Sequence, residues 1–587
     1  MIRLFKYLNK KDWCFALLCL AFIVCQVWLD LKLPDYMSEI TKLVQTEGSS
    51  MNDILLAGGF MLLCALGSLA AAFIVGYFAA KIAAGLSMRL RAMVYNKTLS
   101  FSMEEINGFS TASLITRSTN DITQIQTFVA LGLQAMIKAP ILAVWAVVKI
   151  SGKSWQWTAT TGGAVLVLLI MLGTLIALTL PKFTKLQALT DNLNRVTREN
   201  LTGVRVVRAY NAETYEEEKF ERANEELTKT NLFTNRAMAI MQPGMTLIMS
   251  GLTLAIYWVG VYLIADAPLS GRLSLFSDMV VFSSYAMQVI MAFMMLTMAF
   301  IILPRASVSA KRIHEVLDTE TKIFDGPITD SNLFEVGEVE FRHVSFRYPD
   351  AAEEVLHDIS FTAERGETVA FIGSTGSGKS TLINLIPRFY DATEGEILID
   401  GVNIKDYNQA SLRNKLGYVP QKAVMFSGTV SSNVSYGDSG KETFREDQIR
   451  KAVEVAQAGE FVENMEGTYD AVISQGGTNV SGGQKQRLAI ARAICRQPEI
   501  YVFDDSFSAL DYKTDRKLRR ALKNHTGNST TLIVAQRIGT IMDADKIIVL
   551  DEGRIAGAGT HRELLRTCTV YREIAESQLS KEEIENA

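Results

Sequence analysis

The stretch TVAFIGSTGSGKST, residues 368–381, decides the fold of the C-terminal half of this chain. Its first six residues have the apolar, β-branched character of a buried strand, and Gly373-x4-Gly378-Lys379-Ser380 follows directly. In a loop of this kind backbone N–H groups wrap phosphates, the lysine reaches the outer phosphates and the serine hydroxyl binds Mg²⁺. The sequence therefore predicts an α/β domain that binds a nucleoside triphosphate. The candidate phosphate-binding residues are Gly373, Ser374, Thr375, Gly376, Ser377, Gly378, Lys379, Ser380 and Thr381.

The N-terminal half has a different character. Hydrophobic residues make up 48% of the 587-residue chain and charged residues 21%, and nearly all long apolar runs lie before about residue 305. Six runs are long enough to cross a lipid bilayer as helices, which takes ~20 residues each. They lie near 14–34, 54–80, 128–150, 157–180, 242–265 and 279–303. We expect an all-α transmembrane domain over 1–305 with six spanning helices, a linker over 306–335 and the α/β nucleotide-binding domain over 336–587.

The distribution of charge predicts the orientation and excludes one class of partner. Lysine and arginine are concentrated in the N-terminus and in the connections 81–127 and 182–236, whereas the alternate connections hold few. By the positive-inside rule, both termini and the nucleotide-binding domain lie in the cytoplasm of a multi-pass cell-membrane protein. The short external loops favour a bacterial inner membrane. A net charge of −4 supplies no basic field for nucleic acid, and the six scattered cysteines show no disulfide or zinc spacing.

Further motifs follow the phosphate loop in a fixed order. They are Gln421 within LGYVPQKAVMF, VSGGQKQR at 480–487, IYVFDD at 500–505, SALD at 508–511 and TLIVAQR at 531–537. In order and spacing they resemble the nucleotide-binding domain of ATP-binding cassette (ABC) transporters. FSTASLITRSTNDITQIQ at 109–126 and ENLTGVRVVRAYNAE at 199–213 resemble the two intracellular coupling loops of ABC exporters.

The resemblance implies roles for individual residues and for ATP and Mg²⁺. Tyr348 is expected to stack on adenine, Asp504 to hold Mg²⁺ through water, and Gln421 to sense Mg²⁺ and the attacking water. The signature residues Ser481, Gly482, Gly483 and Gln484 are expected to clamp the γ-phosphate of ATP bound to the opposite subunit. A single chain then completes neither site, so the protein is expected to act as a dimer.

Two positions depart from the family pattern. Asp505 stands where most members have the glutamate that polarises the hydrolytic water, and its carboxylate is retracted by ~1.3 Å, against a required reach of about 2.6–3.2 Å. Gln536 stands in the place of the switch histidine, and an amide carries neither a proton nor a positive charge. The sequence predicts a site that binds ATP and hydrolyses it poorly. With an intact signature, this favours pairing with a different half-transporter over a slow homodimer exporting lipid or peptide.

The cargo is less well defined by the sequence. Met287, Met291, Met294 and Met298 share one face of the last span, as either a flexible surface for apolar ligands or a plain packing face. Lys138 is an ionisable residue within the third span and a candidate cavity group, with Gln134 beside it, whereas Lys149 lies near the outer interface. Small hydrophobic or amphipathic substrates are expected. A nucleotide-gated channel or regulatory subunit is the competing interpretation, and a soluble DNA-repair ATPase does not explain six spans.

Overall fold

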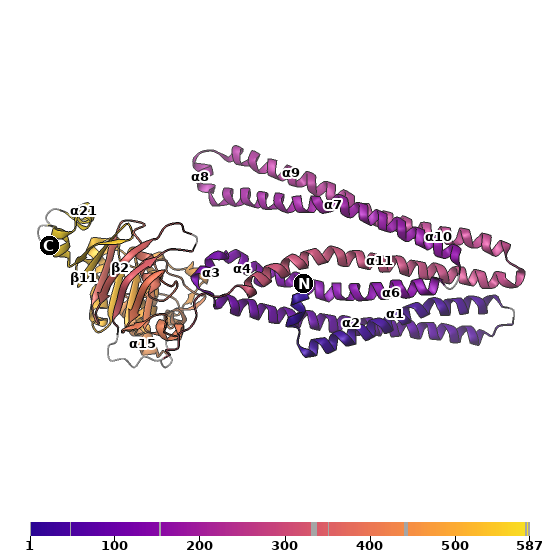
Figure 1. The fold of residues 1–587 in the computed structure, drawn as a ribbon, viewed down its shortest axis with the longest axis horizontal. Helices are drawn as coiled ribbons and strands as arrows, with labels where there is room; N and C mark the ends of the chain where they lie inside the picture. The colour runs from indigo at the N-terminus through magenta and orange to yellow at the C-terminus, as the bar shows by residue number, and fades with distance from the viewer. Residues whose placement is uncertain are drawn as a thin grey trace. The chain divides into compact units, whose positions relative to one another are not determined.

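The computed structural model describes residues 2–46, 48–151, 154–329, 337–349, 351–438, 444–580 and 584. These form two compact units (Figure 1). We call Met1–Thr98 with Ala112–Asp318 the helical unit, and Leu99–Thr111 with Thr319–Ala587 the sheet unit. The predicted boundary at residue 336 lies outside the described residues, and the last long helix runs past residue 305 to Asp318.

The helical unit confirms the six predicted spans, because six of its helical stretches are long and apolar enough to cross a membrane. Its helices are α1 (Lys10–Gln45), α2 (Met51–Leu99), α4 (Thr111–Ser118), α5 (Asn120–Thr127), α6 (Leu133–Ser151), α7 (Trp155–Thr202), α8 (Val204–Ala209), α9 (Glu213–Ala239), α10 (Met241–Asp266) and α11 (Leu269–Asp318). The 49 residues of α2 extend ~73 Å at ~1.5 Å per residue. This is more than twice the ~30 Å of a hydrocarbon core, so the helix continues well beyond a span.

Local sequence explains where the helices begin and how they pack. The backbone N–H of Asn9 donates to Asp12 Oδ2 at 2.9 Å, which caps the start of α1, and Arg89 of α2 forms an ion pair with the same carboxylate. Deeper in the unit, the Trp157 indole donates to the Ile256 carbonyl at 3.1 Å and packs 5.5 Å from the Phe282 ring. Both aromatic side chains are buried.

The sheet unit is built on a six-stranded sheet of order β12-β11-β3-β10-β9-β6. The strands are β3 (Thr368–Gly373), β6 (Leu416–Val419), β9 (Ile500–Asp504), β10 (Thr530–Val534), β11 (Lys546–Asp551) and β12 (Arg554–Gly559). All neighbours pair in parallel except β11 and β12. Every residue of β9 and β10 is buried, as expected for parallel strands covered on both faces.

Smaller elements complete the unit. An antiparallel sheet contains β2 (Leu356–Ala363), β1 (Val339–Phe346), β4 (Glu394–Ile399) and β5 (Val402–Asn403), and β7 (Gly428–Thr429) pairs with β8 (Val472–Ile473). The helices are α3 (Met103–Gly108), α12 (Lys379–Leu385), α13 (Gln409–Asn414), α14 (Val430–Val434), α15 (Glu446–Val455), α16 (Gly459–Glu463), α17 (Gly482–Cys495), α18 (Tyr512–His525), α19 (Ile538–Ile541), α20 (His561–Thr567) and α21 (Thr569–Gln578).

The central strand β3 joins two hydrophobic cores. Ala370 and Ile372 belong to one core, and Val369 and Phe371 belong to the other. Alternate side chains of a strand point to opposite faces, so β3 buries both of its faces while delivering the phosphate loop at its carboxyl end. The predicted fold class, six apolar helices followed by an α/β nucleotide-binding domain, is confirmed.

The burial of β3 generates a stability prediction. Phe371 has no exposed surface, and its ring lies 5.3 Å from that of Phe361. We expect Phe371→Ala to destabilise the sheet unit by ~3–5 kcal/mol, because it leaves a cavity between the sheets. Thermal unfolding of the purified full chain, followed by nucleotide-binding capacity, measures the loss. Phe324→Ala, at a phenylalanine 67% exposed in the same unit, is the control and should change stability by under ~0.5 kcal/mol; equal losses would contradict the assignment of Phe371 to the core.

Candidate functional site

The phosphate loop leaves the carboxyl end of β3 and is closed around its own lysine. The Lys379 ammonium donates to the carbonyls of Gly373 and Ser374, at 2.9 and 2.6 Å, and to Ser377 Oγ at 3.2 Å. Burial lowers the pKa of Lys379, and the charges of Asp505 and Asp504 oppose that effect. The ammonium is thus a buried cation that a triphosphate would neutralise.

Glycine is required at two points of this loop because other backbone passes close by. A Cβ at Gly373 would lie 2.0 Å from the Leu550 carbonyl oxygen, and one at Gly378 would lie 3.1 Å from the Val355 carbonyl oxygen. Gly378 also has a φ of +93°, which side chains rarely allow. The remaining predicted loop residues, Ser374, Thr375, Gly376, Ser377, Ser380 and Thr381, lie in or next to the same turn. The backbone of the loop therefore forms a cradle suited to phosphate.

The acidic pair lies at the end of β9, next to this loop. Ser380 Oγ donates to Asp504 Oδ1 at 2.9 Å, which joins two of the three residues predicted to act on Mg²⁺, the third being Gln421. Burial, and then the neighbouring Asp505 charge, raise the pKa of Asp504 against the opposing bond from Ser380. Among the described residues no group of three acidic, histidine or cysteine side chains could hold a metal. Mg²⁺ needs no such cage, since one carboxylate with phosphate and water oxygens suffices, so a hydroxyl beside a buried carboxylate fits it.

Two glutamines converge on Asp505, which is 8% exposed. Gln536 Nε2 donates to Asp505 Oδ2 at 3.0 Å, and Gln421 Nε2 lies 3.4 Å from the same oxygen. Asp505 has a φ of +45°, and its N–H donates to the Val534 carbonyl at 3.0 Å, which fixes the turn after β9 against β10. Burial raises the pKa of Asp505. The three residues predicted to act on the hydrolytic water are therefore in one cluster, and the carboxylate is an acceptor for both amides.

The signature residues begin α17. Ser481 Oγ accepts from the Gln484 N–H at 3.3 Å, and Gln484 Oε1 accepts from the Ser481 N–H at 2.8 Å. This capping box leaves the serine hydroxyl proton free to donate. Ser481 and Gly482 are exposed, and a Cβ at Gly483 would lie 3.3 Å from the Ala509 carbonyl oxygen. Within the described part of the chain, no hydrogen bond links these residues to the phosphate loop.

Tyr348 lies in an aromatic group that the sequence analysis missed. Its ring is edge-on to Phe346 and Tyr390, at centroid distances of 4.9 and 5.4 Å, and its hydroxyl lies 3.1 Å from Thr381 Oγ1. Tyr390 in turn accepts a bond from Asn107 Nδ2 of α3 at 2.8 Å. The predicted adenine-stacking ring is thus connected to both the phosphate loop and α3.

The short helix α3 precedes the predicted coupling stretch 109–126, which forms α4 and α5, while 199–213 contains α8. Burial alone would raise the pKa of Glu105, but bonds from Ser102 and from the Lys322 N–H hold it below its usual value. Ser102 and Glu105 form a capping box, and the S-x-x-E pattern was a signal available in the sequence. Within the sheet unit, α3 is therefore held at both ends, by Glu105 and by Asn107.

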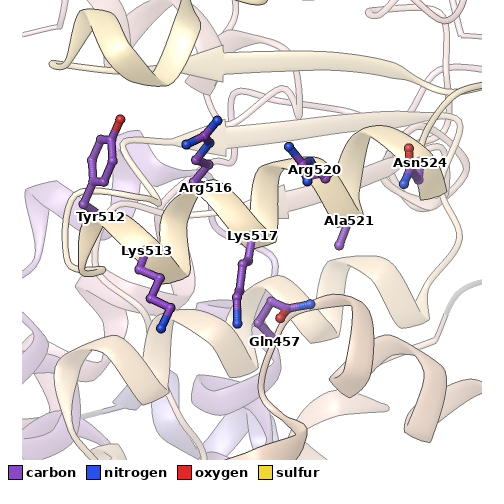
Figure 2. Close-up of a pocket in the computed structure, with 8 residues that line it drawn as sticks. All are labelled: Gln457, Tyr512, Lys513, Arg516, Lys517, Arg520, Ala521 and Asn524. Atoms are coloured by element: carbon purple, nitrogen blue, oxygen red, sulfur yellow. The ribbon is translucent and has the colours of Figure 1, made fainter.

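A hollow of about 650 Å³ follows α18 (Figure 2). It is lined by Gln457, Tyr512, Lys513, Arg516, Lys517, Arg520, Ala521 and Asn524. Its four cations attract anions, but none of its lining residues belongs to the phosphate loop. This hollow is therefore separate from the triphosphate site.

The predicted cavity groups of the helical unit have partners. Lys138 forms an ion pair with Asp30 at 3.2 Å, and Lys149 forms one with Asp35 at 2.8 Å. Gln134 is partly buried on α6. Neither Asp30 nor Asp35 was predicted from the sequence as a partner of these lysines. Asp30 is nevertheless an acidic residue within an apolar run, and such a residue indicates a polar site in a membrane span.

The methionine face of α11 is partly open. Met291 is 49% and Met298 65% exposed, whereas Met287 and Met294 are half-buried. The thioethers of Met291 and Met298 are therefore not covered by packing against other described residues.

Comparison with known proteins identifies the family. Residues 16–317 match the model of the ABC transporter transmembrane region, and residues 356–508 match that of the ABC transporter. An uncharacterized ABC transporter ATP-binding protein of Mycobacterium tuberculosis is 40% identical over 522 residues, covering 89% of this chain and 87% of the relative. The ATP-dependent lipid A-core flippase of Pseudomonas aeruginosa is 32% identical over 493 residues, covering 84% and 80%.

A solved structure supports the same assignment over almost the full length. The structure of a bacterial Atm1-family ABC exporter with ATP bound has a TM-score of 0.80 and 25% identity, covering 97% of this chain and 99% of that chain. With a transmembrane region and an ATPase domain in one polypeptide, this chain belongs to the ABC transporter family, as an ATP-hydrolysing exporter.

Proposed function

We propose that this chain is one half of a heterodimeric exporter that moves hydrophobic or amphipathic compounds out across the cell membrane. Its own ATP site binds nucleotide and hydrolyses it poorly, while its signature residues complete the hydrolysing site of a different half-transporter. The proposal includes the domain division at 305 and 336 and the cytoplasmic placement of both termini and of the nucleotide-binding domain.

The observation that carries the proposal is the set of bonds around Asp505. A general base must bring a carboxylate oxygen within hydrogen-bond reach of the water. Here the shorter side chain faces two amide donors, Gln536 at 3.0 Å and Gln421 at 3.4 Å. Neither amide can take up or release a proton, so the cluster holds an acid in place without a group that shuttles a proton.

The remaining residues retain what nucleotide binding requires. Lys379 supplies a buried cation for the phosphates, Ser380 and Asp504 supply oxygen ligands for Mg²⁺, and Tyr348 supplies a ring for adenine. Bound Mg²⁺ would neutralise charge on the phosphates. In this scheme nucleotide bound by this chain keeps the two nucleotide-binding domains together, and hydrolysis at the partner's site resets the transporter.

The closest competing proposal is a homodimer that exports lipid with slow hydrolysis at two equal sites. It draws on the name of the flippase relatives, ATP-dependent lipid A-core flippase, at 32% identity. The two proposals differ in whether ATP turnover by the assembled transporter depends on Asp505, and the experiments below distinguish them.

Restoring the family's glutamate at position 505 and histidine at position 536 should raise ATP hydrolysis. We expect D505E/Q536H to increase ATP turnover by the purified chain about tenfold or more, since a misplaced base costs on the order of 10²-fold. Steady-state phosphate release measures turnover, and a fluorescent ATP analogue measures binding. D505N is the matched control and should leave turnover near its low starting value. If D505N abolished turnover as fully as K379A, Asp505 would be a working base and the impaired-site proposal would be wrong.

Loss of the signature serine should lower ATP turnover in the complex with the partner rather than in the chain alone. With the partner half-transporter present, we expect S481R to lower ATP turnover on the order of 10²-fold, because it removes a donor to the transition-state phosphate and adds bulk there. D505N in the same complex should lower it less than about threefold. Equal losses from S481R and D505N would instead support two equivalent sites.

A further inference from the structure

A polar group lies inside the predicted membrane-spanning part of the helical unit, where four helices contribute to it. Asp30 of α1 pairs with Lys138 of α6 at 3.2 Å and accepts a hydrogen bond from Ser68 of α2 through its other carboxylate oxygen. The side chains of Asp30 and Lys138 are 25% and 19% exposed. Ionisable groups at this depth are costly, and they are retained chiefly where they meet a substrate or a partner.

A second ion pair in the same unit, between Asp35 and Lys149, provides a comparison. Asp35 pairs with Lys149 at 2.8 Å and accepts a bond from the fully buried Tyr285 hydroxyl at 2.5 Å. Each of its carboxylate oxygens therefore has a strong donor at short range. Asp30 also has a donor on each oxygen, but its bond to Lys138 is longer than the 2.7–2.9 Å typical of charge-assisted bonds, so this ion pair is the more easily exchanged of the two.

Gln288 of α11 adds a third polar group beside Asp30. Its Nε2 donates to the Asp30 backbone carbonyl at 3.3 Å. Its Oε1 is buried, and no described residue donates a hydrogen bond to it. A buried acceptor without a donor is unfavourable until a ligand supplies one. The group therefore offers a cation, an anion and a neutral acceptor.

An apolar track leads away from this polar group along α11. Met291 and Met298 follow Gln288 by three and ten residues, which places them on nearly the same side of the helix. They are 49% and 65% exposed. Thioethers adapt to varied alkyl chains, so a polar site continues into a flexible apolar surface.

We propose that Asp30, Lys138 and Gln288 bind the headgroup of the transported molecule, and that this molecule is a zwitterionic amphiphile with an N–H-bearing ammonium. A ligand carrying only an anion would have to displace Asp30 from Lys138 and leave a carboxylate unpaired in the membrane. A zwitterion replaces both partners at once, with its anion on Lys138 and its ammonium on Asp30. The ammonium N–H groups also reach Gln288 Oε1, which a quaternary ammonium cannot satisfy. This inference rests on the proposed export of amphipathic compounds.

Transport by the full complex in proteoliposomes tests the inference. Four fluorescent probes with the same acyl chains carry a phosphoethanolamine, phosphocholine, phosphoglycerol or uncharged glycerol headgroup, and a hydrophobic dye serves as a headgroup-free reference. We expect ATP-dependent movement of the phosphoethanolamine probe to exceed that of the other three by about tenfold or more. Chain-free phosphoethanolamine at the same concentration should not compete, because the thioether track contributes to binding.

Two variants and a matched control assign the preference to this site. Q288M keeps the side-chain volume and should reduce the preference for phosphoethanolamine over phosphocholine to about twofold or less. D30N/K138M removes both charges together, so neither is left unpaired, and should remove the preference over the uncharged probe. K149M opens the other ion pair; it should lower the thermal unfolding temperature and leave the probe ratios unchanged.

Equal transport of all four probes, a preference for phosphoglycerol, or probe ratios unmoved by both variants would overturn the headgroup assignment. In each of those cases export of the dye would still support the proposed function. Failure to move any probe or the dye, with ATP turnover intact, would reject the proposed function together with the inference.

Discussion

The parallel pairing of β3, β10 and β9 is the constraint on which the nucleotide chemistry depends. Val534 of β10 is in register with Phe371 of β3 on one side and with Asp504 of β9 on the other. Because parallel strands end at the same edge of a sheet, this register brings the phosphate loop, the acidic pair and the residues after β10 to one place. The N–H of Asp505 then bonds to the Val534 carbonyl, so the acid and Gln536 are fixed by neighbouring strands. A change of one residue in register would separate them.

That fixed geometry makes the departures at Asp505 and Gln536 consequential. The backbone of Asp505 is held by β10, so its side chain cannot recover the lost methylene by shifting the strand end. Gln536 reaches the carboxylate in place of a group that could carry charge. In contrast, the signature serine is exposed at the start of α17 and keeps a complete capping box. The molecule therefore combines a phosphate loop with fixed geometry, a short acidic side chain held by two amides and an exposed serine at the start of α17.

The features that could be predicted from the sequence are those formed by contiguous residues. The phosphate loop and the six apolar runs are local patterns, and both were found in the expected order. The contact of Tyr390 with Tyr348 and Asn107 joins three distant segments, and no periodicity reveals it. Likewise, Lys138 was visible as a lone charge in a span, but its partner Asp30 lies more than a hundred residues away. Pairings of this kind depend on which helices pack together, and that information is held by the whole fold.

The two ion pairs of the helical unit are chemically similar but differ in bond length and in their neighbours. Breaking an ion pair in a low-dielectric region is costly unless both ions find new partners, and a longer bond between the two ions lowers that cost. Asp35 has Lys149 and Tyr285 and is stabilised on both oxygens, which ties α1 to α6 and α11. Asp30 also has a donor on each oxygen, Ser68 and Lys138, but its bond to Lys138 is longer, and no described residue donates to the neighbouring Gln288 Oε1. In the proposed headgroup site, the longer Asp30–Lys138 bond and the neighbouring Gln288 oxygen would let this part of the span exchange internal bonds for those of the transported molecule, while the Asp35–Lys149 pair keeps the helices in place.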